Sequence, residues 1–118
     1  MENQNMTEKI IIVGKDFTET PIGRFAKESK FSGETFRQEH LVPALRLFDR
    51  VVVDLAGAEG YGSSFLEESF GGVVRTSDFT NDELRRKLSI ISSEPLLQPY
   101  ADRAKRYFEE AMLRRHER

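Results

Sequence analysis

The sequence predicts an α/β fold: one domain with a small mixed or parallel β-sheet of about four strands, packed with helices. Short runs rich in β-branched residues recur at 9–13, 51–55 and 88–92. Segments with apolar residues at helical spacing alternate with these runs. The 118 residues are enough for one domain, which we expect to span 9–116 after a disordered N-terminus at 1–8.

The first half of the chain contains one clear strand and one helix. The run 9–13, "KIIIV", is a strand that ends at Gly14, and residues 14–32 are a loop in which 23–25 are predicted as a short edge strand. A helix is expected at about 33–47. Pro43 lies within it and should kink or split it, because proline lacks a backbone donor.

The second half repeats the alternation. The run 51–55 is apolar except for Asp54 and predicts a central strand that is buried on both faces. A helix follows from Ser63, and a capping box at 80–83 predicts a short helix up to about Lys87. Pro99 suits the first turn of a final helix. The apolar face of that helix comprises Tyr100, Ala104, Tyr107, Phe108, Ala111 and Met112.

Composition excludes several classes of protein. The absence of cysteine excludes disulfides and thiolate chemistry, and it fits a cytoplasmic protein. No apolar run approaches the roughly 18–20 residues that span a bilayer, so no membrane association is expected. The net charge of −2 argues against a nucleic-acid binder. The arginines near the C-terminus keep open the alternative of a nucleic-acid-associated accessory protein.

The loop after the central strand raises three hypotheses. Gly57–Ser64 reads G-x-x-x-x-G-S-S, which is close to a P-loop but has Ser63 where the phosphate-binding lysine belongs. A lysine-free phosphate nest for a nucleotide or anion therefore stays an alternative. A catalytic serine turn would need a histidine after it in the chain, and only His116 qualifies.

The third hypothesis treats Ser63 as a helix N-cap that can be modified. A helix N-terminus favours an added phosphate, which brings about −1.5 to −2 charges. Serine also caps helices for stability alone, so a purely structural role remains open.

Few other side chains suggest chemistry. Arg24 and Arg37 are expected to flank the loop, as anion or carboxylate ligands or as solvated side chains. Asp54 is expected to cap the turn after its strand. Glu59, Glu67 and Glu68 match no metal-binding loop, and we predict no metal and no cofactor. His40 and His116 are isolated from other ligand types in the sequence and are expected to be surface residues.

The stretch 51–66 resembles the STAS domains, which include bacterial anti-anti-sigma factors. Their typical line is an apolar strand, D-L-S-G-V, three residues and D-S-S-G-L. The residues that match this line are Asp54, Leu55, Gly57, Ser63, Ser64 and Leu66. The chain departs from it at Gly62, where these factors carry aspartate, and at Phe65, where they carry glycine.

The line 32–75 more closely resembles the STAS-like domains of unknown function, and this resemblance covers about residues 9–113. In that pattern Gly33, Glu34, Phe36 and Arg37 open the first helix, Pro43 is usual, and 60–68 is the core signature.

The resemblance implies a non-enzymatic regulatory module that binds proteins, often a GHKL-type kinase or ATPase. The phosphorylated serine of the factors aligns with Ser63 or Ser64. We expect the binding surface at 57–66, and it comprises Glu59, Gly60, Tyr61, Gly62, Ser63, Ser64 and Phe65.

Overall fold

The computed structural model describes residues 6–115 as an α/β domain with a three-stranded parallel sheet. The strands are β1 (Glu8–Ile12), β2 (Arg50–Asp54) and β3 (Leu88–Ile91), and β2 lies in the centre. All three predicted β-branched runs are therefore strands, and the predicted central strand is confirmed. Of the segment 1–8 that was expected to be disordered, residues 1–5 lie outside the described residues. Its last residue, Glu8, is already the first residue of β1.

The predicted sheet of about four strands is wrong by one strand within residues 6–115, because 23–25 form no strand. Gly23 has a φ of 92°, and the chain turns at once. The Glu28 carboxylate accepts the N–H groups of Arg24 and Phe25, at 3.0 and 3.1 Å. Local bonds to a carboxylate thus occupy the donors that a sheet ladder would need.

The helix predicted at about 33–47 is continuous and has a wider turn in its middle. It comprises α1 (Gly33–Phe36), the π-helical turn η2 (Arg37–Leu41) and α2 (Val42–Leu47). The side chain of Ser32 accepts the N–H of Thr35 and so caps its start. Pro43 does not split the helix; the chain accommodates the missing donor with the π-turn directly before it.

The helix after the glycine loop has the same construction. It comprises α3 (Ser63–Leu66), the π-helical turn η3 (Glu67–Gly71) and α4 (Gly72–Thr76). Gly72 makes room for the guanidinium of Arg37 from the preceding helix, because a Cβ there would lie 2.5 Å from Nη1 of Arg37.

The remaining helices follow the local sequence signals. The predicted capping box of Thr80 and Glu83 is present and begins α5 (Asn81–Lys87). The chain then passes through β3 and a 3₁₀ turn, η4 (Pro95–Leu97), into α6 (Gln98–Arg115). Pro99 is the second residue of α6, as predicted. A further π-helical turn, η1 (Val13–Phe17), directly follows β1, where a loop was expected.

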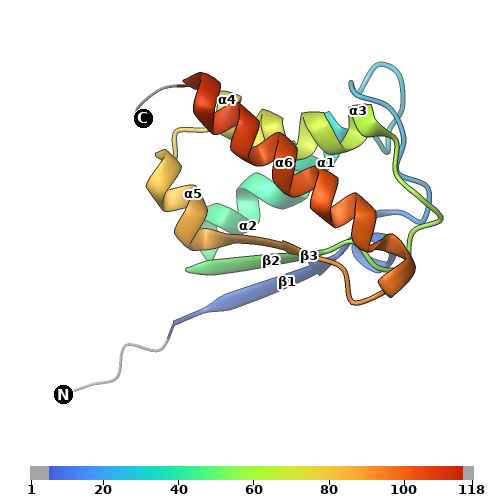
Figure 1. The fold of residues 1–118 in the computed structure, drawn as a ribbon, viewed down its shortest axis with the longest axis horizontal. Coiled ribbons are helices and arrows are strands. Elements are labelled where there is room, and N and C mark those ends of the chain that lie inside the picture. The colour runs from blue at the N-terminus through green and yellow to red at the C-terminus, as the bar shows by residue number, and fades with distance from the viewer. Residues whose placement is uncertain (1–5, 116–118) are drawn as a thin grey trace.

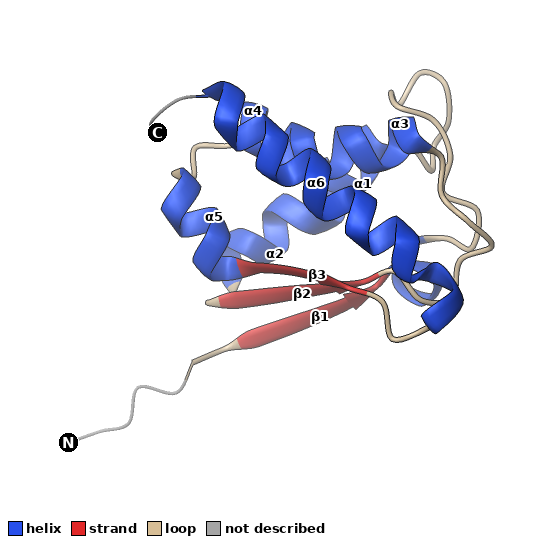
Figure 2. Cartoon of the chain, viewed as in Figure 1, coloured by secondary structure: helices blue, strands red, loops and turns tan. Residues whose placement is uncertain are grey.

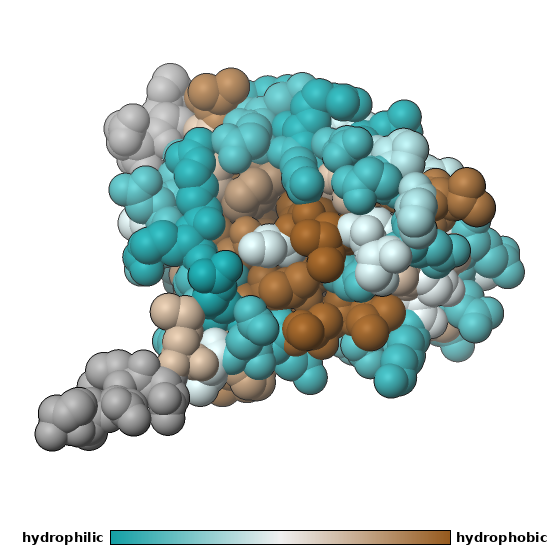
Figure 3. Space-filling model, turned by 60° about the horizontal axis from the view of Figure 1, so that its bottom comes forward, coloured by the Kyte–Doolittle hydropathy of each residue, from teal (hydrophilic) through white to brown (hydrophobic). Residues whose placement is uncertain are grey.

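All the labelled helices lie on one side of the sheet (Figures 1 and 2). Val51 and Val53 face them and are fully buried, whereas Val52 on the other face is only half-buried and Ile10 beside it is 53% exposed. The prediction that β2 is buried on both faces is therefore wrong. Residues 51–53 are continuously apolar because the open face of the sheet also carries apolar side chains, such as Val52 and Ile10. Figure 3, which brings the sheet side forward, shows apolar surface gathered in the middle of this view.

Candidate functional site

The loop after β2 lies where the carboxyl ends of the three parallel strands meet, which is the usual place for ligands and partners in such sheets. Asp54 ends β2, and its Oδ1 accepts the N–H of Ala56 at 3.0 Å, which confirms the predicted cap. The same oxygen accepts the N–H of Ser93 at 2.9 Å. One buried carboxylate thus joins the loop after β2 to the loop after β3.

Two glycines hold the beginning of the loop against the turn that follows β1. Gly57 has a φ of 85°, a conformation that side chains with a Cβ rarely adopt. A Cβ on Gly14 would lie 2.1 Å from the carbonyl carbon of Gly57. The N–H of Gly14 donates to the carbonyl oxygen of Ala56 at 3.0 Å. The loop therefore begins from a rigid contact of backbone on backbone.

Two of the predicted contact residues are buried anchors instead. The Tyr61 hydroxyl donates to the Leu55 carbonyl at 2.6 Å, and its ring packs on Phe65 and Tyr100, with centroids 5.8 and 5.4 Å away. Burial, with a smaller effect from Asp54, raises the pKa of Tyr61. Phe65 is fully buried. These two rings support the loop from below and do not offer a surface to a partner.

The exposed part of the predicted surface is smaller, and we call it the serine turn: Glu59, Gly62, Ser63 and Ser64. Gly60 is half-buried; a Cβ there would lie 3.3 Å from the Tyr100 hydroxyl. The prediction that Ser63 is the N-cap is wrong. Gly62 is the cap residue, and Ser63 and Ser64 are the first two residues of α3. The helix starts one residue early because the carbonyl of Gly62 accepts the N–H of Leu66 at 3.2 Å.

The amides of the loop already have acceptors within the protein at two positions. The N–H of Gly57 donates to Oε1 of Glu94 at 3.0 Å, and the N–H of Glu59 donates to the Glu19 carbonyl at 2.8 Å. A carboxylate therefore lies where a phosphate nest would need an open donor. Sequence reasoning missed Glu94. Its place just after the run 88–92 was a usable signal, because parallel strands end at the same edge of the sheet.

Glu67 and Glu68 lie one helical turn after the two serines, and Arg24 and Arg37 contact them from other parts of the chain. We call this group the arginine–glutamate cluster; its members are Arg24, Arg37, Glu67, Glu68 and Arg75. Arg24 contacts Glu67 at 2.6 Å and Glu68 at 3.1 Å. Arg37 is 5% exposed and contacts the other oxygen of Glu68 at 2.5 Å. Both arginines thus have internal carboxylates as partners, and the expectation of solvated side chains is wrong for Arg37.

Arg75 completes the cluster and was not predicted. Its two terminal nitrogens bind the two oxygens of Glu67 at 2.6 and 3.0 Å. This bond is the main reason that the pKa of Glu67 falls to about 2. The same carboxylate raises the pKa of Arg24 and of Arg75. Glu67 and Arg75 are eight residues apart, more than the three or four residues that separate paired side chains on a helix, so no local pattern in the sequence indicated this pair. With three arginines and two glutamates, the cluster carries one net positive charge, one helical turn after the serines.

The other candidate residues that the structure describes are not gathered into a second site. Within residues 6–115, no group of three or more acidic or histidine side chains could hold a metal ion. His40 is half-buried with its ring against Phe17 and Phe36, so it is not the surface residue expected from the sequence. Arg115 donates to the carbonyls of Val74 and Phe79. His116 lies outside the described residues.

Comparison with known proteins gives one match, and it covers the segment that contains the serine turn. No described helix is long and apolar enough to cross a membrane. No curated protein and no solved structure matched the chain. The model of one family, described as a STAS-like domain of unknown function, matches residues 32–97, which is more than half of the chain. The match includes the continuous helices 33–47 and 63–76, β2, the serine turn, α5 and β3, and it ends directly before α6. The chain therefore belongs to the family of STAS-like domains of unknown function.

Proposed function

We propose that the protein is a non-enzymatic regulatory module that binds a partner protein through the serine turn. The observation that carries this proposal is the contrast within one helical turn. Ser63 and Ser64 are exposed and make no capping bond, whereas Phe65 and Leu66 directly after them are fully buried. Two hydroxyl groups are thus presented on a rigid support. The space beside them is open as well, because a Cβ on Gly62 would meet nothing within 4 Å.

We further propose that Ser63, or else Ser64, is phosphorylated, and that the partner is a GHKL-type kinase or ATPase, as the resemblance to STAS domains implies. A phosphate in the first helical turn is favoured by the helix dipole, by about 0.3–1 kcal/mol. Glu67 and Glu68 lie four residues after the two serines, but both are paired with arginines, so the cluster with its one net positive charge does not oppose the added phosphate. Modification would then change the charge of the surface with little effect on folding.

The first test is the intact mass of the protein purified from its native host, with fragment sequencing. We expect a fraction heavier by about 80 Da, the mass of one phosphate group, localised to Ser63 or Ser64. A uniformly unmodified protein across growth conditions would contradict the phosphorylation and leave constitutive binding as the function.

The second test separates binding from modification. A photoreactive amino acid at position 59 should crosslink the partner, and Ser63→Glu should then weaken binding of that partner without lowering the midpoint of urea unfolding. Ser93→Glu is the matched control, because Ser93 is also an exposed serine in a loop at the same end of the sheet. Unaltered affinity of Ser63→Glu would remove Ser63 from the mechanism.

A further inference from the structure

We propose a second binding surface, at the free edge of β3, that accepts an extended segment of a partner protein as an additional strand. The segment we infer has apolar side chains at alternate positions and a carboxylate at one end. This surface is formed by β3, α5 and α6 and includes no residue of the serine turn.

The edge of β3 offers unused backbone groups. Among residues 6–115, β3 pairs with β2 on one side and with no strand on the other, because the strand order is β1-β2-β3. The carbonyl of Ile91 points toward β2 and accepts the N–H of Leu55 at 2.9 Å. Backbone groups alternate in direction along a strand, so the N–H and C=O of Ile90 point away from the sheet. Unpaired edges of this kind are where extended peptides add.

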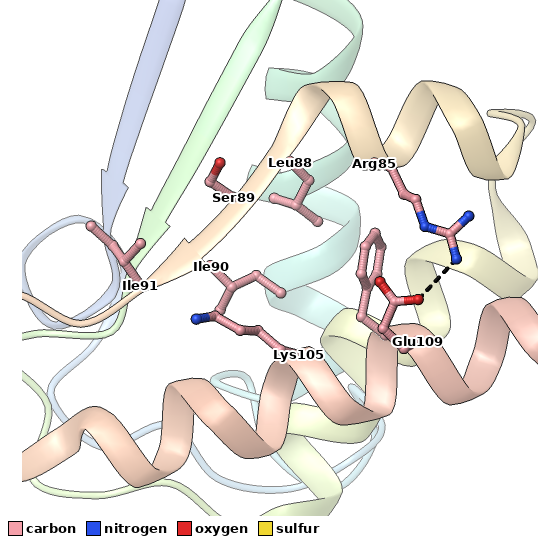
Figure 4. Close-up of a pocket in the computed structure, with 8 residues that line it drawn as sticks. Arg85, Leu88, Ser89, Ile90, Ile91, Lys105 and Glu109 are labelled. Carbon is pink, nitrogen blue, oxygen red and sulfur yellow. Dashed lines mark hydrogen bonds and ion pairs between the residues drawn. The ribbon is translucent and has the colours of Figure 1, made fainter.

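A groove runs alongside this edge and would receive every second side chain of the added strand. It has a volume of about 610 Å³ and lies between β3 and α6. Leu88, Ile90 and Phe108 form its apolar floor. Figure 4 shows the groove, with the Lys105 side chain reaching from α6 toward Ile90. Ile91, on the opposite face of the strand, is 41% exposed and would contact the intervening side chains.

The charges at the groove favour an acidic segment. Glu109 on its wall already pairs with Arg85, at 2.9 Å (Figure 4). Lys105 is exposed, and within residues 6–115 no carboxylate forms an ion pair with it. The groove therefore carries one net positive charge. A second copy of this chain would bring a like charge to the same place, so an acidic partner is the better complement.

The probes are two seven-residue peptides that place two valines and one glutamate on the same face of a strand. Their sequences are TVTVTET and TETVTVT, which put the carboxylate at either end and so allow both strand directions. The full-length protein, labelled with ¹⁵N, is titrated with each peptide to millimolar concentration. We expect one of them to shift the amide resonance of Ile90 and its neighbours on β3 and α6. Unchanged spectra with both peptides would overturn the proposal and leave Lys105 as a charge that only protects the edge.

Two controls show whether the peptide adds as a strand beside Lys105. Methylation of one alternate set of peptide amides should abolish binding, and methylation of the other set should not, because only one set faces β3. The unmodified protein should bind the glutamate peptide about two- to fivefold more tightly than the same peptide with lysine in place of glutamate. Lys105→Glu should reverse this preference by a similar factor. Arg103→Glu, an exposed change on α6 outside the groove, should keep the original preference. Equal binding of both methylated peptides, or no effect of Lys105→Glu, would contradict the proposal.

The same titration is independent of the function proposed for the serine turn. Ser63→Glu should bind the peptide as the unmodified chain does, so loss of either surface can be recognised without the other. Concentration-dependent shifts of the β3 amides in the absence of peptide would show that a second copy occupies the edge, and they would overturn the assignment to an acidic partner.

Discussion

At the scale of single residues, two glycines of the loop after β2 have different roles. Gly57 adopts a φ of 85° and lies against Gly14, so that a Cβ on Gly57 would lie 3.2 Å from the Gly14 Cα. Gly62 has an ordinary extended conformation, φ −74° and ψ 147°, and open space around it. The first glycine is needed by the backbone, whereas the second is needed by nothing within the described residues.

Substitution of these two glycines should therefore have opposite results. Gly57→Ala should lower the free energy of unfolding by about 1–2 kcal/mol, the cost of a left-handed conformation for a residue with a Cβ. Gly62→Ser should leave it unchanged or raise it by a few tenths, because serine at an N-cap accepts a helical N–H. Urea unfolding of both variants measures the difference. Equal losses would mean that the loop, and not the conformation of Gly57, determines the effect.

At the scale of elements, the arginine–glutamate cluster joins the continuous helix 33–47 to the continuous helix 63–76. Arg37 comes from η2, and Glu68 comes from η3. Arg37 also donates to the Glu68 carbonyl at 3.1 Å. Its guanidinium thus bonds both the side chain and the backbone of the helix that carries the serine turn. Loss of either partner would leave a charge in a place that water reaches poorly.

We expect Arg37→Ala to destabilise the protein by about 3 kcal/mol, at the low end for a broken buried ion pair, because Arg24 still neutralises Glu68. Arg46→Ala is the matched control: Arg46 is exposed on α2 of the same continuous helix. Its loss should cost less than about 0.5 kcal/mol. Chemical unfolding of the two variants decides. A similar small loss in both would show that the buried pair contributes no net stability.

At the scale of the whole molecule, the cluster makes stability depend on acid. The pKa of Glu67 is about 2 in the folded protein, against 4.5 for a free side chain. The folded state therefore binds this proton less readily than the unfolded state. The stabilisation is fully present above about pH 5 and is lost as the pH falls toward 2. Hydrogen bonds from backbone N–H groups lower the pKa of Glu28 and of Asp49, which adds to the same trend.

Glu67→Gln should remove part of this dependence. At pH 7 the variant should be less stable by about 1 kcal/mol, since Glu67 is partly exposed and solvent screens the pair. The difference should shrink as the pH falls below about 5 and vanish only below about pH 2, where Glu67 is protonated in both states. Urea unfolding at a series of pH values tests this. A difference that stays constant with pH would show that the charge of Glu67 is not responsible.

Most of the fold was predictable from short stretches of sequence. The run 51–55 identified the central strand, and Thr80 with Glu83 identified the start of α5. Ser63 and Ser64 were expected at the start of a helix, and they are there. In each case the periodicity or the hydrogen-bonding partner lies within a few residues, so local patterns contain the answer.

By itself, then, the sequence determined the strands, the long helices and the place of the serine turn after β2. Only the tertiary structure decided that one face of the sheet is open, that Arg24 and Arg37 pair with glutamates, and that Glu94 accepts the N–H of Gly57. The bonds responsible join distant residues: Arg37 and Glu68 are 31 positions apart, Gly57 and Glu94 are 37 apart, and Arg24 and Glu67 are 43 apart. Which of many charged side chains meet across such distances depends on how the helices pack on the sheet, because no local pattern specifies the partner.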